Sequence, residues 1–320
     1  MYSEAFYCSW FPMGRFQVNA GVRQVVIKVT QELAALMGTA IGTMLSPHPG
    51  ARAHGGSINE AWRWESRQGP LFVKVAEASQ HAMFAAEAAG LEDLRAAAAV
   101  RVPAVLGCGV GAGCAWLALE WIDFGFGDGA TEARLGTCLA LQHRRIADTF
   151  GWSRDNTIGS TPQINSWCQD WVDFWRERRL RYQLELAARN GHGARLERGG
   201  QRLLDHVGGF FDTYRPAASL LHGDLWGGNW GADRDGEPVI FDPAVYYGDR
   251  EADLAMTRLF GGYGPHFYAA YEAAWPLDAG AASRVRLYNL YHVLNHLNLF
   301  GPGYLRQALD MVESLNAELI

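Results

Sequence analysis

Residues 221–242, LHGDLWGGNWGADRDGEPVIFD, limit the possible folds of this chain more than any other stretch. Asp224 stands five residues before Asn229, and an apolar run then leads to a second carboxylate, Asp242. Phosphoryl transfer from ATP needs a carboxylate at the acceptor hydroxyl, together with an amide oxygen and a second carboxylate that hold Mg²⁺ on the phosphates. The segment supplies these groups in the order in which a kinase catalytic loop uses them. We therefore predict Asp224 as the catalytic base and Asn229 and Asp242 as Mg²⁺ ligands.

Each part of this motif also has a simpler explanation. Asp and Gly are the ordinary residues of turns, so an HGD turn or a lone aspartate after a strand is common in loops that do no chemistry. The parts occur together here, in order and with kinase-like spacing, and this combination favours the phosphotransfer interpretation.

Length and composition exclude some classes of protein. A chain of 320 residues is long enough for two lobes, and 49% hydrophobic with 19% charged residues is ordinary for a soluble globular protein. The net charge is −6, and no Lys/Arg-rich stretch is interleaved with aromatic residues. We therefore expect no nucleic-acid partner. A monomer is the favoured oligomeric state.

Cysteine usage and hydropathy predict a cytoplasmic protein without a membrane anchor. The five cysteines are scattered and lack C-x-x-C spacing, which argues against a disulfide framework or a zinc site and fits a reducing compartment. The first residues lack the pattern of a signal peptide. Residues 102–119 are uncharged, but a proline and four glycines interrupt them, so a hairpin in a soluble lobe is a better interpretation than a membrane span.

The hydrophobic pattern predicts an α+β fold in three parts. Residues 1–28 are aromatic and weakly patterned, which predicts a poorly ordered extension. Residues 29–123 are the small nucleotide-binding lobe, with an antiparallel sheet and one main helix. Residues 124–320 are a larger, mostly helical lobe with the catalytic loop and the substrate site. The stretch 125–130, GFGDGA, is a flexible breaker at the boundary.

Periodicity predicts the elements inside each lobe. In the small lobe we expect helices at 30–44 and 79–99 and strands at 59–64, 70–75, 102–106 and 115–122. In the large lobe we expect one strand at 238–242 and helices at 132–147, 164–189, 201–214, 252–260, 266–274 and 282–299.

Lys74 is the predicted phosphate-binding lysine. It lies in LFVKV, the kind of strand that presents a lysine to the α- and β-phosphates of a nucleotide. A lysine in a strand is more often a solvated edge residue, so this assignment depends on the catalytic loop downstream. A carboxylate on the following helix should hold the lysine, and we predict Glu87, with Glu92 as the competing partner.

A glycine turn precedes Lys74 by the length of a hairpin, as a phosphate-covering loop would. Its glycines let backbone N–H groups approach the phosphates closely. The turn lacks the full G-x-G-x-x-G pattern, so its position is its main support. Its residues are Gly55, Gly56, Ser57 and Ile58.

The segment Glu120-Trp121-Ile122 occupies the place of a kinase hinge, directly after a predicted strand. Backbone groups of a hinge bind adenine, so the identity of the side chains matters little. We include these three residues in the predicted nucleotide site.

Three other patterns indicate structure rather than chemistry. Residues 107–112 match G-x-G-x-x-A, but we predict a strand after them where a dinucleotide site needs a helix, so we interpret them as a hairpin turn. His292 and His296 lie four apart on a predicted helix but lack the glutamate of H-E-x-x-H and a third ligand. The third pattern is an aromatic stripe at helical spacing, for which packing is the default and a sugar site the alternative: Trp167, Trp171 and Trp175.

With these residues identified, the chain resembles the fructosamine kinase family, also called ketosamine-3-kinases, which is related to the aminoglycoside phosphotransferases. The likeness runs from about residue 30 to the C-terminus. The motif HGD-x-x-x-x-N is shared with aminoglycoside and choline kinases, whereas DNTIGSTPQIN and DPAVYYGDREADLAMT are much more specific. The other segments that carry the likeness are GGSINEAWRW, GPLFVKV, FAAEAAGLEDLR, LALEWIDF, FWRERRLRYQ and LYNLYHVLNHLNLFG.

The resemblance implies a protein-kinase-like fold and a kinase that uses ATP and Mg²⁺ to phosphorylate the 3-hydroxyl of a ketosamine, free or on a protein. A ketosamine is a sugar joined to an amine after Amadori rearrangement, and its phosphorylation makes the adduct unstable, so that the amine is released. The roles implied for this chain are those of a base at Asp224, metal ligands at Asn229 and Asp242, and a phosphate clamp of Lys74 with Glu87.

The resemblance also bears on regulation. Some relatives carry a cysteine in the glycine turn that acts as a redox switch, whereas this chain has Ser57 there, so we do not expect that switch. Asp253, in READLA, is expected to brace the catalytic loop. No phosphorylatable activation segment follows Asp242, which predicts an enzyme that needs no activation step.

Two alternatives to the ketosamine kinase remain. One is a kinase of the aminoglycoside or choline kinase type that acts on another hydroxyl substrate. The other is a nucleotide-binding pseudokinase, although such proteins usually lose the lysine, the catalytic aspartate or the metal-binding aspartate, and this chain retains all three.

Overall fold

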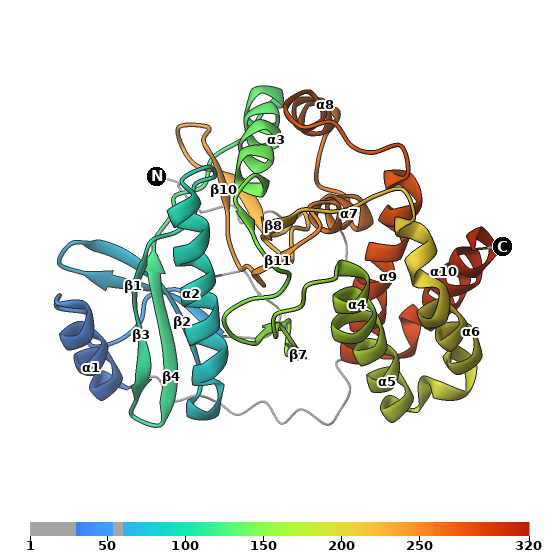
Figure 1. The fold of residues 1–320 in the computed structure, drawn as a ribbon. Coiled ribbons are helices and arrows are strands. Elements are labelled where there is room, and N and C mark those ends of the chain that lie inside the picture. Colours follow the sequence, from blue (N-terminus) through green and yellow to red (C-terminus); the bar gives the residue numbers. More distant parts are fainter. Residues whose placement is uncertain (1–29, 54–59, 320) are drawn as a thin grey trace.

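The structure is a computed structural model that describes residues 30–53 and 60–319 (Figure 1). One part is built around a sheet and the other is mostly helical, so the predicted α+β, two-lobed architecture is confirmed. The predicted extension, residues 1–28, and the glycine turn Gly55-Gly56-Ser57-Ile58 lie outside the described residues.

The sheet of the small lobe has four antiparallel strands in the order β1-β2-β4-β3. They are β1 (Glu60–Ser66), β2 (Gly69–Glu77), β3 (Val105–Gly111) and β4 (Cys114–Glu120). Side chains alternate between the two faces of a strand. In β2, Leu71, Val73 and Val75 therefore pack on one face, and Lys74 lies on the other.

Two helices cover the two faces of this sheet. Helix α1 (Gln31–Ile41) packs on the face away from the helical lobe, where Leu33 and Met37 join the cluster of Val73 and Val75. Helix α2 (His81–Ala97) lies along the opposite face (Figure 1) and shares the continuous core of the large lobe. Lys74 therefore faces α2 and the catalytic lobe.

The glycines at 107–111 lie inside β3, so their assignment to a hairpin turn was wrong; the turn is only residues 112–113. The reason lies across the sheet. A Cβ on Gly107 or Gly109 would stand 3.1 or 3.0 Å from the ring of Trp116 in β4. Glycines on this face of β3 make room for that ring. A strand still follows the G-x-G-x-x-A pattern, so the dinucleotide interpretation stays rejected.

The large lobe begins with α3 (Gly129–His143), whose N-terminus is capped by the Asp128 side chain. Helix α8 (Pro265–Ala274) lies beside it (Figure 1). Gly136 permits this close approach, because a Cβ there would collide with the carbonyl oxygen of Phe267. The end of α3 is thereby held against α8, and this pair carries residues that support the catalytic loop.

Short strands that were not predicted from the sequence position the predicted catalytic residues. Strand β8 (Ala218–Leu221) pairs with β5 (Ile146–Ala147) and β11 (Tyr246–Gly248), and it ends where the HGD motif begins. The predicted strand at 238–242 is present as β10 (Pro238–Ile240), paired with β9 (Trp230–Ala232). The catalytic loop thus runs from β8 to β9, and Asp242 follows β10.

A long, irregular helical segment follows the hairpin of β6 (Asn156–Ile158) and β7 (Thr161–Gln163). The helix predicted at 164–189 begins only at Trp171, because Asp170 caps it and the preceding residues are used in side-chain hydrogen bonds. The segment comprises α4 (Trp171–Phe174), a π-helical stretch (Trp175–Arg181), α5 (Tyr182–Ala187), a second π-helical stretch (Ala188–His192) and α6 (Gly193–His206).

The C-terminal helices complete the lobe. They are α7 (Glu251–Leu259), α9 (Ala281–Phe300) and α10 (Leu305–Glu318), the last of which was not predicted. Of the tryptophan stripe, Trp171 and Trp175 pack in the core with ring centroids 5.5 Å apart, whereas Trp167 precedes the helix and is half exposed. Among the described helices, none combines the length and the apolar character that crossing a bilayer requires.

Candidate functional site

The catalytic loop turns sharply at Gly223. This residue has φ +83°, and a Cβ on it would collide with the carbonyl oxygen of Ala244, so only glycine fits. The backbone N–H of Ala244 also donates to the carbonyl of His222 at 2.8 Å. The crossing of these two backbones brings the loop that carries Asp224 beside the segment that carries Asp242.

Asp253 on α7 braces this turn by hydrogen bonds to its backbone, as expected from the sequence. Its carboxylate accepts hydrogen bonds from the backbone N–H groups of His222, at 2.7 Å, and Gly223, at 2.8 Å. The side chain is 1% exposed. Burial alone would disfavour the charge, but hydrogen bonds from His143 and the Gly223 amide outweigh it and hold the pKa of Asp253 below its usual range.

Asp224 and Asn229 meet across the catalytic loop. The Nδ2 of Asn229 donates to the backbone oxygen of Asp224 at 2.8 Å and to its carboxylate at 3.2 Å. Because the amide nitrogen makes these bonds, the amide oxygen is the atom that can meet a cation. Burial, and then the charge of Asp242, raise the pKa of Asp224 to about 7. A carboxylate with a raised pKa is suited to accept a proton.

Asp242 lies in an unusual backbone conformation. Its φ is +58°, which is uncommon for a residue other than glycine and costs about 1–3 kcal/mol. The surrounding chain fixes it, because Phe241 donates its N–H to Asn229 and its carbonyl lies 3.0 Å from His222 Nε2. This conformation directs the carboxylate toward the small lobe.

Lys74 joins the two lobes at the site. Its Nζ lies 2.7 Å from Glu87 Oε1 on α2 and 2.6 Å from Asp242 Oδ1. The predicted pairing of Lys74 with Glu87 is therefore present, while the competing partner, Glu92, lies 3.9 Å from Arg95 instead. Burial disfavours the charge of Lys74, but the two carboxylates more than offset it and raise its pKa. Lys74 is thus a buried, charged ammonium group.

The predicted hinge lies at the end of β4. The side chain of Glu120 accepts from the Ala104 N–H at 3.1 Å and pairs with Arg101 at 2.7 Å, and Arg101 also contacts Asp233 in the large lobe. The ion pair with Arg101, which itself contacts the large lobe, therefore fixes the side chain of Glu120. Trp121 and Ile122 follow it, the former half exposed and the latter buried.

An aromatic row beside Asp224 was missed by the sequence analysis. It runs from the catalytic loop to the end of α9, with neighbouring ring centroids 4.8–6.5 Å apart. Its two most exposed members are Trp226 and Phe300. The row could not be recognised from spacing, because three separate segments supply it: Trp226, Phe260, His296, Phe300 and Tyr304.

The specific motif DNTIGSTPQIN forms a buried amide network behind Asp242. Asn156 donates to the Val245 carbonyl at 2.8 Å, and Gln163 donates to the Ala244 carbonyl at 3.1 Å. Asn165 donates to the side-chain oxygen of Asn156 at 2.8 Å. Neutral amide side chains therefore hold the backbone of the segment that follows Asp242.

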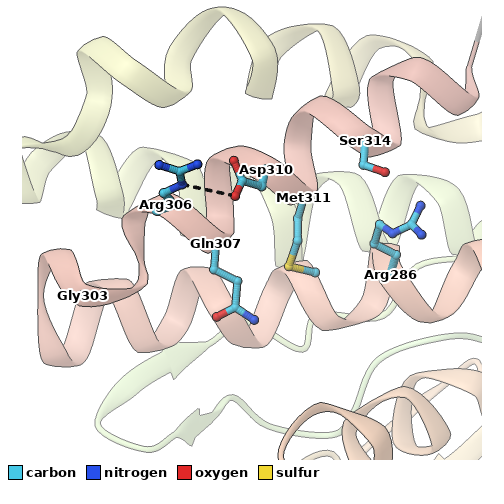
Figure 2. A pocket seen from close by; sticks show the side chains of 7 residues that line it. All are labelled: Arg286, Gly303, Arg306, Gln307, Asp310, Met311 and Ser314. Carbon is cyan, nitrogen blue, oxygen red and sulfur yellow. Dashed lines mark ion pairs between the residues drawn. The ribbon is translucent and has the colours of Figure 1, made fainter.

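A groove on the described surface lies elsewhere, between α9 and α10 (Figure 2). It has a volume of about 460 Å³ and contains an exposed ion pair, Arg306–Asp310, at 3.6 Å. None of the predicted phosphotransfer residues lines it. Its other lining residues are Arg286, Gly303, Gln307, Met311 and Ser314.

Comparison with known proteins agrees with this geometry. The family model described as fructosamine kinase matches residues 29–318. A protein named as a probable ketoamine kinase from Synechocystis is 45% identical over 81% of this chain and 87% of its own length. A chloroplastic protein-ribulosamine 3-kinase from Arabidopsis thaliana is 42% identical over 81% of this chain and 80% of its own length.

Solved structures place the fold in the same group. A protein from Haemophilus somnus, provisionally described as a fructosamine-3-kinase, has a TM-score of 0.81 at 26% identity and covers 89% of this chain and 97% of its own. An aminoglycoside phosphotransferase in complex with ADP and hygromycin B has a TM-score of 0.59 at 15% identity, covering 89% and 98%. The second likeness concerns the fold alone.

Proposed function

We propose, from the premise that this chain belongs to the fructosamine kinase family, that it transfers the γ-phosphoryl group of ATP to the 3-hydroxyl of ketosamines. The observation that carries the proposal is the contact of Lys74 with both Glu87 and Asp242, beside Asp224. Phosphorylation would make the sugar–amine adduct unstable and release the amine, so the reaction removes glycation.

We assign Asp224 as the base that accepts the proton of the attacking hydroxyl. Its raised pKa matches that task, and its bond to Asn229 fixes its orientation. Lys74 is assigned to the phosphates of the nucleotide, with Glu87 as the residue that holds it in place.

Asn229 and Asp242 are assigned as the ligands of Mg²⁺. An amide oxygen and a carboxylate are the oxygen donors that Mg²⁺ prefers, and substrate phosphates usually complete such a site. Bound there, the ion would neutralise charge on the β- and γ-phosphates. The left-handed backbone of Asp242, which directs its carboxylate to the phosphate-binding lysine, supports this assignment.

For the nucleotide, we assign the backbone of Glu120, Trp121 and Ile122 to adenine. The glycine turn at 55–58 is assigned to the phosphates on its sequence position alone. The division of the chain at residues 123/124, with 1–28 as a separate extension, is part of the same proposal. We also propose a cytoplasmic monomer without a nucleic-acid partner, in accord with the scattered cysteines and the net charge of −6.

The aromatic row is assigned to the acceptor side. Trp226 stands two residues after Asp224, and its ring lies against Gly228, where a Cβ would collide with it. Aromatic faces suit the carbon-bound hydrogens of a sugar and the apolar part of its amine carrier. Burial lowers the pKa of His296, and its Nδ1 lies 2.8 Å from the carbonyl of His292. The neutral ring therefore offers its Nε2 as an acceptor for a substrate hydroxyl.

A panel of acceptors tests the proposal. Purified protein with ATP and Mg²⁺ is given ribulosamines, erythrulosamines and fructosamines, free and protein-bound, and is compared with aminoglycosides and choline. We expect ATP consumption only with ketosamines. Turnover with an aminoglycoside or choline instead would indicate another small-molecule kinase. Nucleotide binding without turnover on any acceptor would indicate a pseudokinase.

A further inference from the structure

We infer that His143, the last residue of α3, is a positioning residue for the phosphotransfer reaction, acting on the catalytic loop through Asp253. The inference rests on the proposed function for its kinetic part. His143 is 0% exposed and touches neither Asp224 nor Asp242, so it is not a catalytic residue. Its Nε2 lies 3.1 Å from Asp253 Oδ2, the oxygen that also accepts from the His222 N–H.

The hydrogen bonds around His143 form a chain across three helices, in which each group donates to the next. Arg250 is only a donor, and its NH1 lies 3.2 Å from the Tyr271 hydroxyl oxygen. The hydroxyl oxygen of Tyr271 lies 2.8 Å from His143 Nδ1. All these groups are satisfied when Tyr271 donates its O–H to Nδ1 and the imidazole carries its proton on Nε2. That proton then points at Asp253.

The contact matters because Asp253 has to hold two backbone amides at once. One carboxylate oxygen accepts from Gly223 at 2.8 Å, and the other accepts from His222 at 2.7 Å and from His143. The donor from α3 locks the rotation of the carboxylate and helps to keep it ionised in its buried position. Without that donor the carboxylate can turn, and the HGD turn loses its fixed support.

The consequence is displacement of Asp224, because Gly223 connects it directly to the amides that Asp253 holds. Misplacement of a reacting group by about 1 Å can lower a rate about 10²-fold. Binding of ATP depends on Lys74 and the hinge, which lie on other elements, and should be unaffected. A positioning role therefore lowers kcat with little change in KM for ATP.

Two amide substitutions of His143 form a matched test. The side chain of Gln reaches the position of Nε2 and can donate to Asp253, whereas that of Asn reaches only the position of Nδ1. We expect His143→Asn to lower kcat about 10- to 100-fold and His143→Gln to retain it within about threefold. KM for ATP should stay within about twofold in both variants.

A stability-matched control separates positioning from general weakening of the fold. Val312→Ala removes buried methyl groups where α10 packs on α6. Neither helix carries the catalytic loop. It should lower Tm without lowering kcat at a temperature well below Tm. If kcat follows Tm across the three variants, or if Asn serves as well as Gln, the positioning role is overturned.

Hydrogen exchange tests the same inference without relying on the substrate assignment. The amides of His222 and Gly223 should exchange at least tenfold faster in His143→Asn than in His143→Gln. Equal protection in both variants would overturn the inference. A wild-type protein that is inactive on every ketosamine but shows the expected exchange would overturn only the proposed function.

Discussion

Two groups of charged residues lie within thirty residues of each other in the sequence, but their surroundings and roles differ. Asp224 and Asp242 are half-buried at the meeting of the lobes, close enough that the charge of one raises the pKa of the other. The second group, here called the support group, comprises Asp249, Arg250, Glu251 and Asp253, and each member is buried with partners inside the large lobe. Acidic residues near the HGD turn are therefore not equivalent: the half-buried pair is the one proposed to react, and within the enclosed group Asp253 holds the loop.

Members of the support group have hydrogen-bond or ion-pair partners inside the large lobe. Glu251 pairs with Arg284 through both oxygens, at 2.7 and 3.0 Å. Arg250 donates to the carbonyls of Trp275 and Pro276 at 2.8 and 2.6 Å. Asp249 accepts from Tyr214 at 3.0 Å and from Tyr288. The family-specific run GDRE is thus explained by structure and needs no substrate.

Loss of Asp224, the carboxylate proposed as the base, should give the largest effect. Asp224→Ala should lower kcat about 10²–10⁴-fold, as expected for a lost general base. The variant should fold at least as stably as the wild type, because it removes a partly buried charge that Asp242 repels. Steady-state kinetics and a thermal melt check both parts. Unchanged turnover would contradict the assignment of Asp224.

Glu251→Gln should have the reverse effect: it should lower the stability of the fold and leave kcat unchanged. Breaking a buried pair leaves Arg284 uncompensated and should cost about 3–5 kcal/mol of unfolding free energy. The matched control is Glu177→Gln, which breaks the exposed pair with Arg181, seen at 2.7 Å, and should cost at most about 0.5 kcal/mol. Urea unfolding measures both. Equal losses would remove the distinction between buried and exposed pairs.

A smaller effect is expected behind the catalytic loop, where two glycines provide a matched pair. A Cβ on Gly262 would stand 2.6 Å from the Cα of Gly227, and φ there is +93°; Gly261 has φ +74° with nothing within 4 Å of a Cβ. Gly262→Ala should displace the loop and lower kcat about 10-fold or more. Gly261→Ala should cost only about 1 kcal/mol of stability. Kinetics that do not differ between the two would show that this contact does not position the loop.

The most gradual effect should appear in the pH dependence of stability. Burial, and then the charge of Glu251, raise the pKa of Asp249 to about 7. Between pH about 4 and about 7 the folded state therefore holds a proton that the unfolded state has released, so unfolding free energy falls as pH rises, by at most about 1.4 kcal/mol per pH unit. Asp249→Asn keeps the shape and should flatten this slope. An unchanged slope in denaturant titrations would assign the effect to other groups.

The sequence allowed prediction where local pattern and tertiary contact agree. Lys74 and Glu87 were predictable because a strand lysine and a helix carboxylate meet in any lobe of this type, and the structure contains that pair. The Gly107 and Gly109 assignment failed because the cause, the ring of Trp116, lies across the sheet. Local periodicity carries no information about which distant side chain needs the space.

Residues whose roles depend on several segments could not be predicted. Trp226, Phe260 and His296 come from three separate elements, so no spacing rule brings them together. The start of α4 was misplaced for a related reason: Asn165 is occupied with Asn156, a partner in the preceding hairpin, and this contact keeps the chain out of the helix. Tertiary hydrogen bonds overrode helical propensity there.

The most direct test of the assigned reaction is to locate the phosphate on the product. Wild-type protein, ATP, Mg²⁺ and a ribulosamine or fructosamine are incubated, and the product is examined by two-dimensional ³¹P–¹H NMR. We predict coupling of the phosphorus to the proton on carbon 3 of the sugar, and a rate of formation of this product that is lower by about 10²-fold or more with Asp224→Ala. Phosphate on another hydroxyl, or an undiminished rate with the Asp224 variant, would contradict the assigned reaction.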